Sequence, residues 1–331
     1  MKEMLKLNKL VIGYASSKKD AKALMPPISV SMNSGDLVAL TGPNGAGKTT
    51  LFRALSSNIL PLGGEIFIDQ QNMRKLHARE KSALLSIVLT DRIGDQYMKV
   101  SDVVASGRYP YVGIWARLNK LDRQIIDQSL HLAGIEALAA RTLQSLSDGE
   151  RQKVMIAKAL AQDTPLILMD EPAAFLDYPS KIALIRLLKT LSSEHNKTIL
   201  FSSHDLDMII SNVDKIWLMA PQKPMISGIP EDLLASGKMN DYFGIPYQLA
   251  HTVFDYAGLS SPKNNSVCVH GVGEDYNWLR HALRRKGYAV SETKGDIVLR
   301  IADGKYILSD KQVISKFDTL EKLTNEIDKY F

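Results

Sequence analysis

The chain has 331 residues, of which 45% are hydrophobic and 23% charged, with a formal net charge of +5. This composition is typical of a soluble globular protein, and the length predicts one domain of ordinary size plus a smaller one. The single cysteine, Cys268, excludes an intrachain disulfide, and no apolar run approaches the ~18 residues that span a bilayer.

Three further expectations come from the same features. Cys268 lies in an apolar run and is expected to be a small core residue. No continuous apolar segment follows the first residues, so no signal peptide is expected. The mild positive charge permits contact with acidic phospholipid or nucleic acid but demands neither.

The N-terminal region begins with two predicted strands. Apolar residues alternate from Leu5 to Tyr14, and a second strand, Ile28 to Met32, ends at the turn signal Asn33-Ser34-Gly35-Asp36. We interpret these strands as an antiparallel edge that leads into the first parallel strand. Tyr14 ends the first strand, where its ring could stack on an adenine or serve as a core or turn residue; spacing alone leaves both open.

The next stretch carries the clearest chemical motif. Residues Thr41 to Thr50 fit the pattern G-x-x-x-x-G-K-[ST], with a short apolar strand before them and helical spacing after them. Glycines let the backbone curl around one anion, and the N-terminus of the helix adds roughly half a positive charge. Lys48 is expected to contact the β- and γ-phosphates, and the Thr49 hydroxyl is expected to ligate Mg²⁺.

The motif therefore predicts binding of a nucleoside triphosphate. The expected nucleotide-binding residues are Gly42, Pro43, Asn44, Gly45, Ala46, Gly47, Lys48, Thr49 and Thr50.

The pattern changes after this motif. A turn and a strand are predicted within 61–68, and another strand is predicted at 84–89, followed by Thr90-Asp91. From about residue 100 to 145 the pattern becomes helical, and Ser101 is predicted to cap the first helix. The helical segments are predicted at 102–106, 122–133 and 135–140. An all-helical insert is thus expected within an otherwise alternating α/β chain.

A second segment with candidate functional residues begins with Leu146-Ser147-Asp148-Gly149-Glu150, which precedes a predicted helix. Beyond it, Pro165 to Met169 is a buried strand that delivers Asp170 and Glu171 at its C-terminal end. Asp170 can hold Mg²⁺, and Glu171 can orient and deprotonate an attacking water. The alternative is a strand that ends in solvated acids; the preceding phosphate-binding loop favours the catalytic interpretation.

The last part of this pattern places a histidine at the end of a strand. A helix is predicted from Pro179 to Ser192, and a buried strand from Thr198 to Ser203. His204 follows this strand and is expected at the same edge of the parallel sheet as Lys48 and Glu171. It could therefore meet the γ-phosphate, or it could be a hydrogen-bonded structural histidine.

These ordered motifs resemble an ATP-binding-cassette (ABC) ATPase over about residues 1–258. The stretch Leu146–Glu150 is similar to the family signature, which is usually Leu-Ser-Gly-Gly-Gln. The resemblance implies an α/β P-loop NTPase fold with an ABC-type antiparallel β subdomain and a helical insert at about residues 92–163. Beyond the region of resemblance, the residue pattern predicts a linker at 259–266 and a small α+β domain at 267–331, which the family core lacks.

The resemblance also implies a mechanism in which ATP and Mg²⁺ are the cofactors. Tyr14 would stack on adenine, Asp170 would bind the metal, and Glu171 would be the catalytic base. Lys48 and the switch histidine His204 would act beside it, and Ala174–Asp177 would be the D-loop, ending in Asp177. The signature residues would face the γ-phosphate held by another protomer, which requires a homodimer: Ser147, Asp148, Gly149 and Glu150.

Several positions depart from the family pattern. Thr90 stands where the Q-loop glutamine is usual; its hydroxyl is a further candidate Mg²⁺ ligand. Asp148 and Glu150 replace glycine and glutamine, and we expect both acids to point away from the phosphate, as is favourable at a helix N-terminus. Ala173 replaces a usual threonine, which removes a local hydrogen bond.

A finer resemblance concerns the helical insert. Val100-Ser101-Asp102-Val103-Val104 followed by Gly107-Arg108-Tyr109-Pro110 looks like importer ATPases for ferric siderophores, haem and cobalamin. It implies integral-membrane permease subunits as partners, an extracytoplasmic substrate-binding protein acting indirectly, and no nucleic acid. The expected location is cytoplasmic, peripheral on the inner face of the cell membrane. The alternative is a soluble ABC ATPase that moves no substrate, as in iron–sulfur assembly.

The C-terminal piece has a pattern of its own. Strands are predicted at 267–270, 288–290, 297–302 and 306–308, and helices at 278–286 and 317–330. Gly271-Val272-Gly273 is interpreted as a turn, because Tyr276 occupies the third glycine position of a dinucleotide fingerprint. Arg284-Arg285-Lys286 is expected to be a solvated helix end, with contact to lipid headgroups as the alternative. A regulatory or dimer-stabilising role is expected for this domain.

Overall fold

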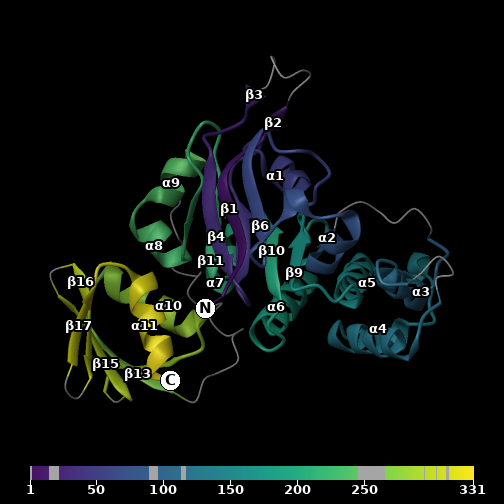
Figure 1. Cartoon of the computed structure of the whole chain (residues 1–331). Coiled ribbons are helices and arrows are strands. Elements are labelled where there is room, and N and C mark those ends of the chain that lie inside the picture. The colour runs from purple at the N-terminus through teal and green to yellow at the C-terminus, as the bar shows by residue number, and fades with distance from the viewer. Residues whose placement is uncertain are drawn as a thin grey trace. The chain divides into compact units, whose positions relative to one another are not determined.

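A computed structural model describes residues 2–14, 22–88, 96–112, 117–244, 265–293, 295–302, 304–310 and 313–331 (Figure 1). The chain divides into two compact units. The first comprises Met1–His204 and Met219–Ile226, and the second comprises Asp205–Leu218 and Ser227–Phe331. The division therefore falls directly after His204, and each unit is described by itself below.

An antiparallel sheet opens the first unit, as the alternating pattern predicts. Strand β1 (Glu3–Val11) pairs with β4 (Ile28–Asn33) on one side and with β6 (Gly63–Ile68) on the other. Strand β6 also pairs with β7 (Gln71–Asn72), and β2 (Gly13–Tyr14) pairs with β3 (Lys22–Ala23). The alternating leucines of β1 are buried, so this sheet turns one apolar face inward.

Parallel strands form the centre of the first unit. Strands β5 (Leu37–Thr41), β10 (Thr198–Ser202), β9 (Leu166–Met169) and β8 (Leu85–Val88) pair side by side in that order. Every residue of β5, β9 and β10 is buried, which explains their continuous apolar runs. Helices of this unit are α1 (Lys48–Leu55), α2 (Ala78–Leu84) and α6 (Tyr178–Ser193), with η1 at Met73–Lys75. The carboxyl ends of these strands share one edge, where the chemical motifs lie.

The helices of the insert lie together within the first unit (Figure 1). Their buried side chains form a hydrophobic core of their own. Its elements are α3 (Val100–Ala105), η2 (Ser106–Arg108), α4 (Lys120–Leu132), η3 (Glu136–Leu138), η4 (Leu143–Ser145) and α5 (Asp148–Ala161). Two details of the prediction are wrong. Helix α3 begins at Val100 with Lys99 as its N-cap, and only one 3₁₀ turn forms within 135–140.

Tertiary contacts explain the displaced cap. The N–H groups of Val100 and Ser101 donate to the carbonyls of Arg141 and Ala139, at 2.9 Å each. Helix α3 therefore needs no capping hydroxyl, because another segment of the insert supplies the acceptors.

Gly107 and Arg108, which belong to the importer-like segment, pack against the neighbouring helices of the insert. The side chain of Arg108 is buried, donating to Asp122 Oδ1 at 3.0 Å and to the carbonyl of Ala161 at 2.9 Å. A Cβ at Gly107 would lie 2.3 Å from the carbonyl oxygen of Lys158. The missing side chain of Gly107 and the buried hydrogen bonds of Arg108 therefore allow η2 to pack closely against α5.

The second unit begins with α7 (Leu206–Asn212) and β11 (Lys215–Leu218), and continues through β12 (Ile226–Gly228), α8 (Pro230–Ala235) and α9 (Lys238–Phe243). A sheet follows, in the order β14-β13-β15-β16-β17. Its strands are β13 (Ser266–His270), β14 (Ala289–Ser291), β15 (Ile297–Ala302), β16 (Lys305–Asp310) and β17 (Val313–Phe317). Strand β13 runs parallel to β14 and β15, and the remaining pairs are antiparallel.

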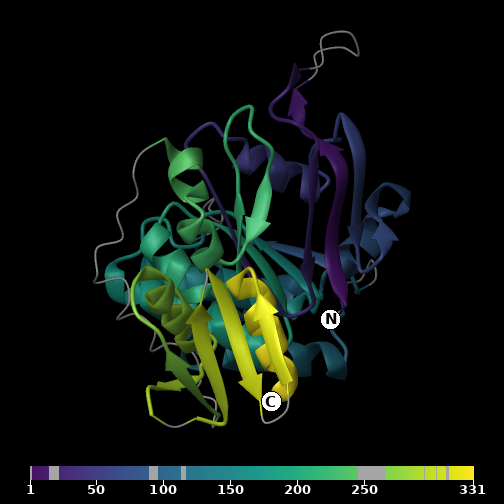
Figure 2. The ribbon, with the colours of Figure 1, turned by 90° about the vertical axis from the view of Figure 1, so that its left-hand side faces the viewer.

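Helices α10 (Glu274–Arg285) and α11 (Leu320–Tyr330) cover one face of this sheet (Figures 1 and 2). Cys268 is buried, as predicted. The expectation of a solvated end at 284–286 is wrong for Arg285, which is only 3% exposed. The sequence reading also missed β17 and began the last helix too early.

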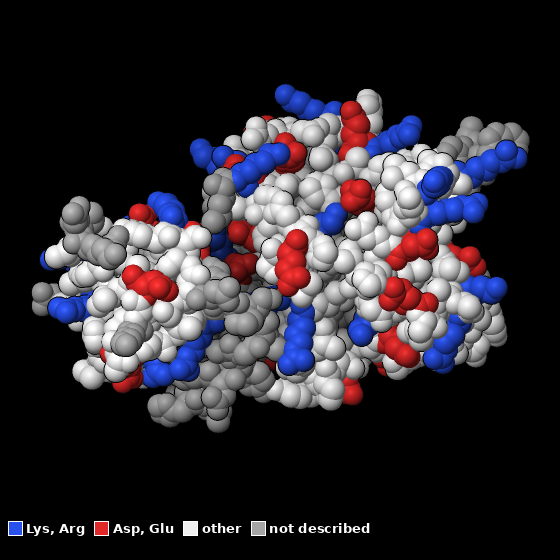
Figure 3. Space-filling view, turned by 90° about the horizontal axis from the view of Figure 1, so that it is seen from below, with Lys and Arg blue, Asp and Glu red and all other residues white. Residues whose placement is uncertain are grey.

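The surface of the molecule carries both signs of charge. On the face shown in Figure 3, the basic and acidic side chains of the described residues are interspersed. Within the part of the chain that the structure describes, no helix combines the length and apolarity needed to cross a membrane.

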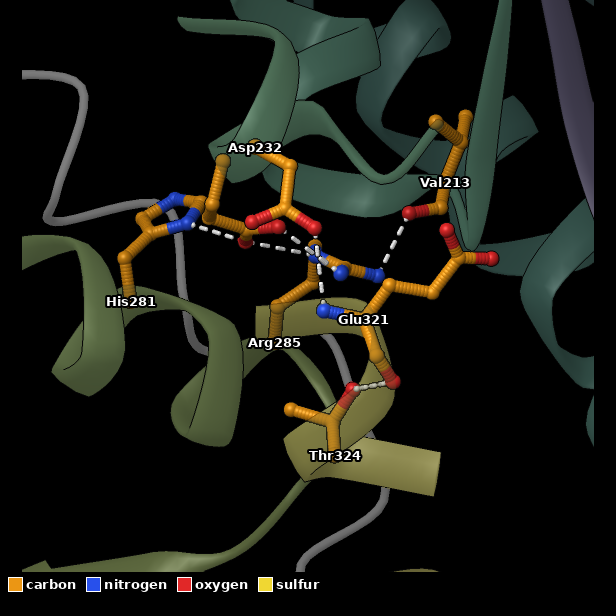
Figure 4. A network of polar contacts seen from close by, with 7 residues as sticks. Val213, Asp232, His281, Arg285, Glu321 and Thr324 are labelled. Atoms are coloured by element: carbon orange, nitrogen blue, oxygen red, sulfur yellow. Dashed lines mark hydrogen bonds and ion pairs between the residues drawn. The ribbon is translucent and has the colours of Figure 1, made fainter. Parts of the chain in front are cut away.

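A buried charged network lies within the second unit, where Arg285 of α10 meets Glu231 of α8 (Figure 4). Arg285 Nε lies 2.9 Å from Glu231 Oε1, and Arg285 Nη2 lies 3.0 Å from Glu231 Oε2. His281 Nδ1 lies 2.7 Å from the same Oε1. Glu231, His281 and Arg285 are each at most 3% exposed, so the network is shielded from solvent.

Candidate functional site

The loop between β5 and α1 is curled by glycines in the left-handed region. Gly42 has a φ of 152° and Gly47 a φ of 101°. A Cβ at Gly42 would lie 2.0 Å from the carbonyl oxygen of Met219, so no larger residue fits there. Gly47 is the N-cap of α1 and brings no side chain to that position, which leaves the first N–H groups of the helix directed toward the loop.

Lys48 lies inside this curl. Its side chain is nearly buried, and its Nζ donates to the carbonyls of Gly42 at 2.8 Å and Pro43 at 3.2 Å. Burial lowers the pKa of Lys48, while the charges of Glu171 and Asp170 oppose that shift. The structure thus brings the loop lysine and the acidic pair into one electrostatic site.

Other predicted loop residues differ in their exposure. Thr49 and Asn44 are exposed, whereas Ala46 and Thr50 are buried. Tyr14 is not a core residue: it is 61% exposed, and its hydroxyl lies 3.0 Å from Thr50 Oγ1. This contact holds the ring of Tyr14 beside the first turn of α1, at the edge of the glycine loop.

The acidic pair follows β9 and is tied to the neighbouring strand by Ser202. The N–H of Glu171 donates to Ser202 Oγ at 2.7 Å, and Ser202 Oγ donates to Asp170 Oδ1 at 2.6 Å. Glu171 has a φ of 47°, a strained conformation for a residue with a side chain. The hydroxyl of Ser202 therefore stabilises the turn at Asp170 and Glu171, and this turn determines the orientation of both carboxylates.

Sequence reasoning missed Ser202. The signal was its position: Phe201 of β10 pairs with Met169 of β9, so the next residues of the two strands are Ser202 and Asp170. A polar residue at the buried end of a central strand needs a partner, and the carboxylate supplies one.

His204 lies against the second acid. Its Nε2 is 2.8 Å from Glu171 Oε1, and both side chains are partly exposed. The structure thus brings the two predicted catalytic residues into contact at the shared edge of β9 and β10. Such a contact can orient the carboxylate and exchange a proton with it.

The signature segment forms the N-terminus of α5. Ser147 is its N-cap, and Glu150 Oε2 accepts from Ser147 N at 2.8 Å and from Ser147 Oγ at 2.9 Å. These hydrogen bonds lower the pKa of Glu150. Asp148 Oδ1 lies 3.3 Å from Arg151 Nη1. Both acids are therefore engaged within their own helix end.

The predicted signature packs against the start of α6, the helix that follows the predicted D-loop. Asp177 caps α6 by accepting from the N–H of Ser180 at 3.0 Å, and hydrogen bonds from Ser180 lower the pKa of Asp177. A Cβ at Gly149 would lie 2.9 Å from Ser180 Oγ. A pocket of 240 Å³ lies between the two helix starts, lined by residues that include Ser147, Glu150 and Leu176.

The residues present fit a divalent cation bound together with a nucleotide. Among the described residues, no group of three or more His, Cys, Asp or Glu could hold a metal by itself. The hydroxyl of Thr49 and the carboxylate of Asp170 are oxygen ligands of the kind that Mg²⁺ prefers. Phosphate oxygens would have to complete such a site. The further candidate Thr90 lies outside the described residues.

Two family models match the chain. One, described as ABC transporter, matches residues 25–174, and the other, described as iron ABC transporter C-terminal domain, matches residues 264–328. The first covers the glycine loop, the signature and the acidic pair. The second covers the sheet and helices of the C-terminal part.

Curated relatives match most of the chain. An uncharacterized ABC transporter ATP-binding protein of Methanocaldococcus jannaschii is 32% identical over 86% of this chain and 97% of the relative. A petrobactin import ATP-binding protein of Bacillus anthracis is 32% identical over 73% of this chain and 87% of the relative. The ferric enterobactin transport ATP-binding protein of Escherichia coli is 29% identical over 66% and 80%.

Solved structures agree in fold. A structure described as a metal-chelate type ABC transporter in an inward-facing conformation matches with a TM-score of 0.63 and 27% identity, over 74% of this chain and 90% of that chain. A dimeric ATP-binding cassette bound to ADP and phosphate matches with a TM-score of 0.59 over 69% and 99%. At 23% identity, that second likeness shows the fold alone.

Proposed function

The chain belongs to the ATP-binding subunits of ABC transporters, and from this premise we propose that it powers the import of a ferric siderophore, haem or cobalamin-type substrate. Subunits of this family are ATPases. Relatives of this chain are named for the import of petrobactin and for the transport of ferric enterobactin. These names favour an importer over the alternative of a soluble ABC ATPase that moves no substrate.

The chain's own residues account for hydrolysis of the terminal phosphate. The N–H groups of the loop, the N-terminus of α1 and Lys48 bind the phosphates. Glu171 takes the proton of the attacking water, and His204 holds its carboxylate at 2.8 Å. Ser202 keeps the strained turn at Glu171 in place. Mg²⁺, held by Thr49 and Asp170, would neutralise charge on the phosphate oxygens.

Family members dimerise and work with membrane permeases. We propose a homodimer in which Ser147 and Gly149 of one subunit complete the γ-phosphate site of the other. Asp148 and Glu150 stay engaged on α5, as their hydrogen bonds indicate. The dimer would lie on the inner face of the cell membrane, beneath permease subunits that an extracytoplasmic substrate-binding protein supplies. Tyr14, exposed beside the loop, would stack on the adenine.

One observation carries the choice of importer. Beyond the ATPase region, the chain matches a C-terminal domain described as belonging to iron ABC transporters. The substrate class therefore rests on a second match, separate from the glycine loop and the acidic pair.

The experiment that tests the proposal is reconstitution. The chain is purified from detergent together with a permease and placed in liposomes with a binding protein for each candidate substrate. ATP-dependent uptake of ferric siderophore, haem and cobalamin is then measured. We expect uptake of one of them, abolished by E171Q. An active ATPase that neither binds a permease nor drives uptake would favour the soluble alternative.

A further inference from the structure

Tyr14 is the last residue of a short strand in the first unit. This strand, β2, pairs only briefly with β3, and Tyr14 lies opposite Lys22 (Figure 1). The side chain of Tyr14 is 61% exposed, so the strand presents the ring to solvent. An exposed side chain that a ligand immobilises loses rotamer freedom, and this loss lowers the affinity for the ligand. The contribution of the ring to nucleotide binding therefore depends on what orders it beforehand.

The backbone around β2 and β3 packs against the glycine loop. A Cβ at Gly13 would lie 2.1 Å from the carbonyl oxygen of Lys22, so a glycine is needed for the two strands to approach. The N–H of Leu24 donates to the carbonyl oxygen of Ile12 at 3.0 Å. A Cβ at Gly47 would lie 3.3 Å from Leu24 Cδ1 and 3.6 Å from Ile12 Cδ1. The residues that flank the two strands are therefore packed over the N-cap of α1.

The ring of Tyr14 is held by a hydrogen bond to the helix of the phosphate-binding motif. Tyr14 Oη lies 3.0 Å from Thr50 Oγ1, and Thr50 is only 6% exposed. Thr50 belongs to the first turn of α1, which begins with Lys48. A β-branched side chain in a helix has few rotamers, so the Thr50 hydroxyl is a well-defined partner for the exposed phenol.

We propose that Thr50 is a positioning residue for the nucleobase: its hydroxyl holds the ring of Tyr14 in the orientation that stacks on the adenine of ATP. The inference rests on the proposed function, in which Tyr14 forms the stacking surface for the base. One helical turn then serves both ends of the nucleotide, because Lys48 binds the phosphates and Thr50 orders the ring. Loss of the hydrogen bond should weaken binding only of ligands that carry a base.

The size of this effect follows from the kind of hydrogen bond. The net contribution of one neutral hydrogen bond corresponds to a factor of about 5 in an equilibrium constant. Tyr14→Phe keeps the aromatic ring, so the stacking surface itself remains. Tyr14→Ala removes the ring as well, and the loss of base stacking adds to the loss of the hydrogen bond.

The test compares two ligands that differ in the base. Binding of ATP and of inorganic triphosphate, each with Mg²⁺, is measured on the full chain by isothermal titration calorimetry. In Y14F the affinity for ATP should fall ~5-fold, while the affinity for inorganic triphosphate stays at the wild-type value. In Y14A the affinity for ATP should fall further, again without a change for inorganic triphosphate.

A double-mutant cycle assigns the effect to the pair of hydroxyls. T50V keeps the shape of the side chain and removes its hydroxyl, and its affinity for inorganic triphosphate corrects for any loss at the phosphates. The ratio of the ATP affinity to the triphosphate affinity should fall ~5-fold alike in Y14F, T50V and Y14F/T50V, because all three lack the same hydrogen bond. T50S keeps a hydroxyl and should restore most of this ratio.

The matched control is Y109F. Tyr109 is also 61% exposed, but it lies in the helical insert, directly after η2. Both affinities of Y109F should equal those of the wild type. Three results would overturn the proposal: wild-type ATP affinity in Y14F, an equal fall of both affinities in Y14F, or effects of Y14F and T50V that add in the double variant. The second would mean that the hydrogen bond only stabilises the loop.

The positioning role and the proposed function fail in different measurements. Wild-type protein that binds neither ATP nor inorganic triphosphate would refute the assigned nucleotide site and the role of Thr50 with it. ATP binding without uptake in the liposomes would refute the importer and leave the role of Thr50 intact. Wild-type ATP affinity in Y14F would refute the role of Thr50 and leave the ATPase assignment intact.

Discussion

At the residue scale, the geometry of the site depends on one glutamate in a strained conformation. Glu171 has a φ of 47°, its N–H is bound by Ser202, and its carboxylate is bound by His204. Strain of this kind persists only where surrounding contacts enforce it. The glutamate and its serine partner each lead to a prediction.

The first concerns the general base. Glu171→Gln keeps the size of the side chain and the N–H bond to Ser202, but it cannot take a proton. We expect ATP binding to persist, hydrolysis to fall by ~10²–10⁴-fold, and a nucleotide-bound dimer to accumulate. Phosphate release and light scattering measure this. Glu136→Gln is the matched control, because Glu136 lies 2.6 Å from His131 in an exposed pair elsewhere. Hydrolysis at the wild-type rate in E171Q would remove Glu171 as the base.

The second prediction concerns the serine that the sequence reading missed. Ser202→Ala removes the acceptor of the Glu171 N–H and the donor to Asp170. We expect kcat to fall by roughly 10-fold, since one lost hydrogen bond is worth about 1 kcal/mol and a bond to a charged group more. Ser86→Ala is the control, because Ser86 is a buried strand serine bonded to Thr164. Equal kcat in both variants would make Ser202 a packing residue only.

At the element scale, the starts of α5 and α6 approach closely, so the predicted signature and the predicted D-loop lie side by side. Gly149 permits this, because a side chain there would collide with Ser180 Oγ. The first turn of α5 also carries Ser147 in a capping box, which fixes the entry of the chain into the helix.

This packing predicts the effect of one methyl group. Gly149→Ala places a Cβ 2.9 Å from Ser180 Oγ and should push the two helix starts apart. We expect weaker ATP-induced dimerisation and a several-fold lower kcat, measured by size-exclusion chromatography and phosphate release. G149A/S180A removes the colliding hydroxyl and should recover part of both. No recovery in the double variant would mean that the added methyl group acts directly at the phosphate site rather than through packing.

At the scale of the whole molecule, the chain combines a nucleotide site in one compact unit with a buried charged network in the other. The pKa of Glu231 falls from its ordinary 4.5 to about 2 in the folded protein. A depressed carboxylate pKa adds stability that is fully present above the unfolded pKa and is lost as the pH falls toward the folded one.

A pH prediction follows for the second unit. Between pH 5 and pH 3 the network should lose about 2 kcal/mol of unfolding free energy, since each pKa unit corresponds to about 1.4 kcal/mol. Urea titrations at the two pH values measure the loss. In Glu231→Gln this contribution is absent, so the gap in stability between wild type and variant should narrow as the pH falls. A gap that stays constant would show that Glu231 does not titrate in this range.

The features that the sequence predicts correctly are those that depend on residues close together in the chain. The glycine loop, the strand that delivers Asp170 and Glu171, and His204 at the end of β10 were each read from a short stretch. Strand period, glycine conformation and helix N-termini are properties of neighbouring residues. The resemblance of the ordered motifs to one family then supplied the roles of Tyr14, the signature and Asp177, which stay predictions.

By itself, then, the sequence determined the fold class, the nucleotide-binding loop and the acidic pair, because each is encoded within short stretches of neighbouring residues. Only the tertiary structure decided that Ser202 ties the acids, that Arg141 and Ala139 replace a cap at Ser101, and that Arg285 is buried against Glu231. These partners lie far apart along the chain. From the sequence alone, a charged residue at a helix end is predicted to be solvated. Only the folded structure shows whether an opposite charge lies beside it and allows it to be buried.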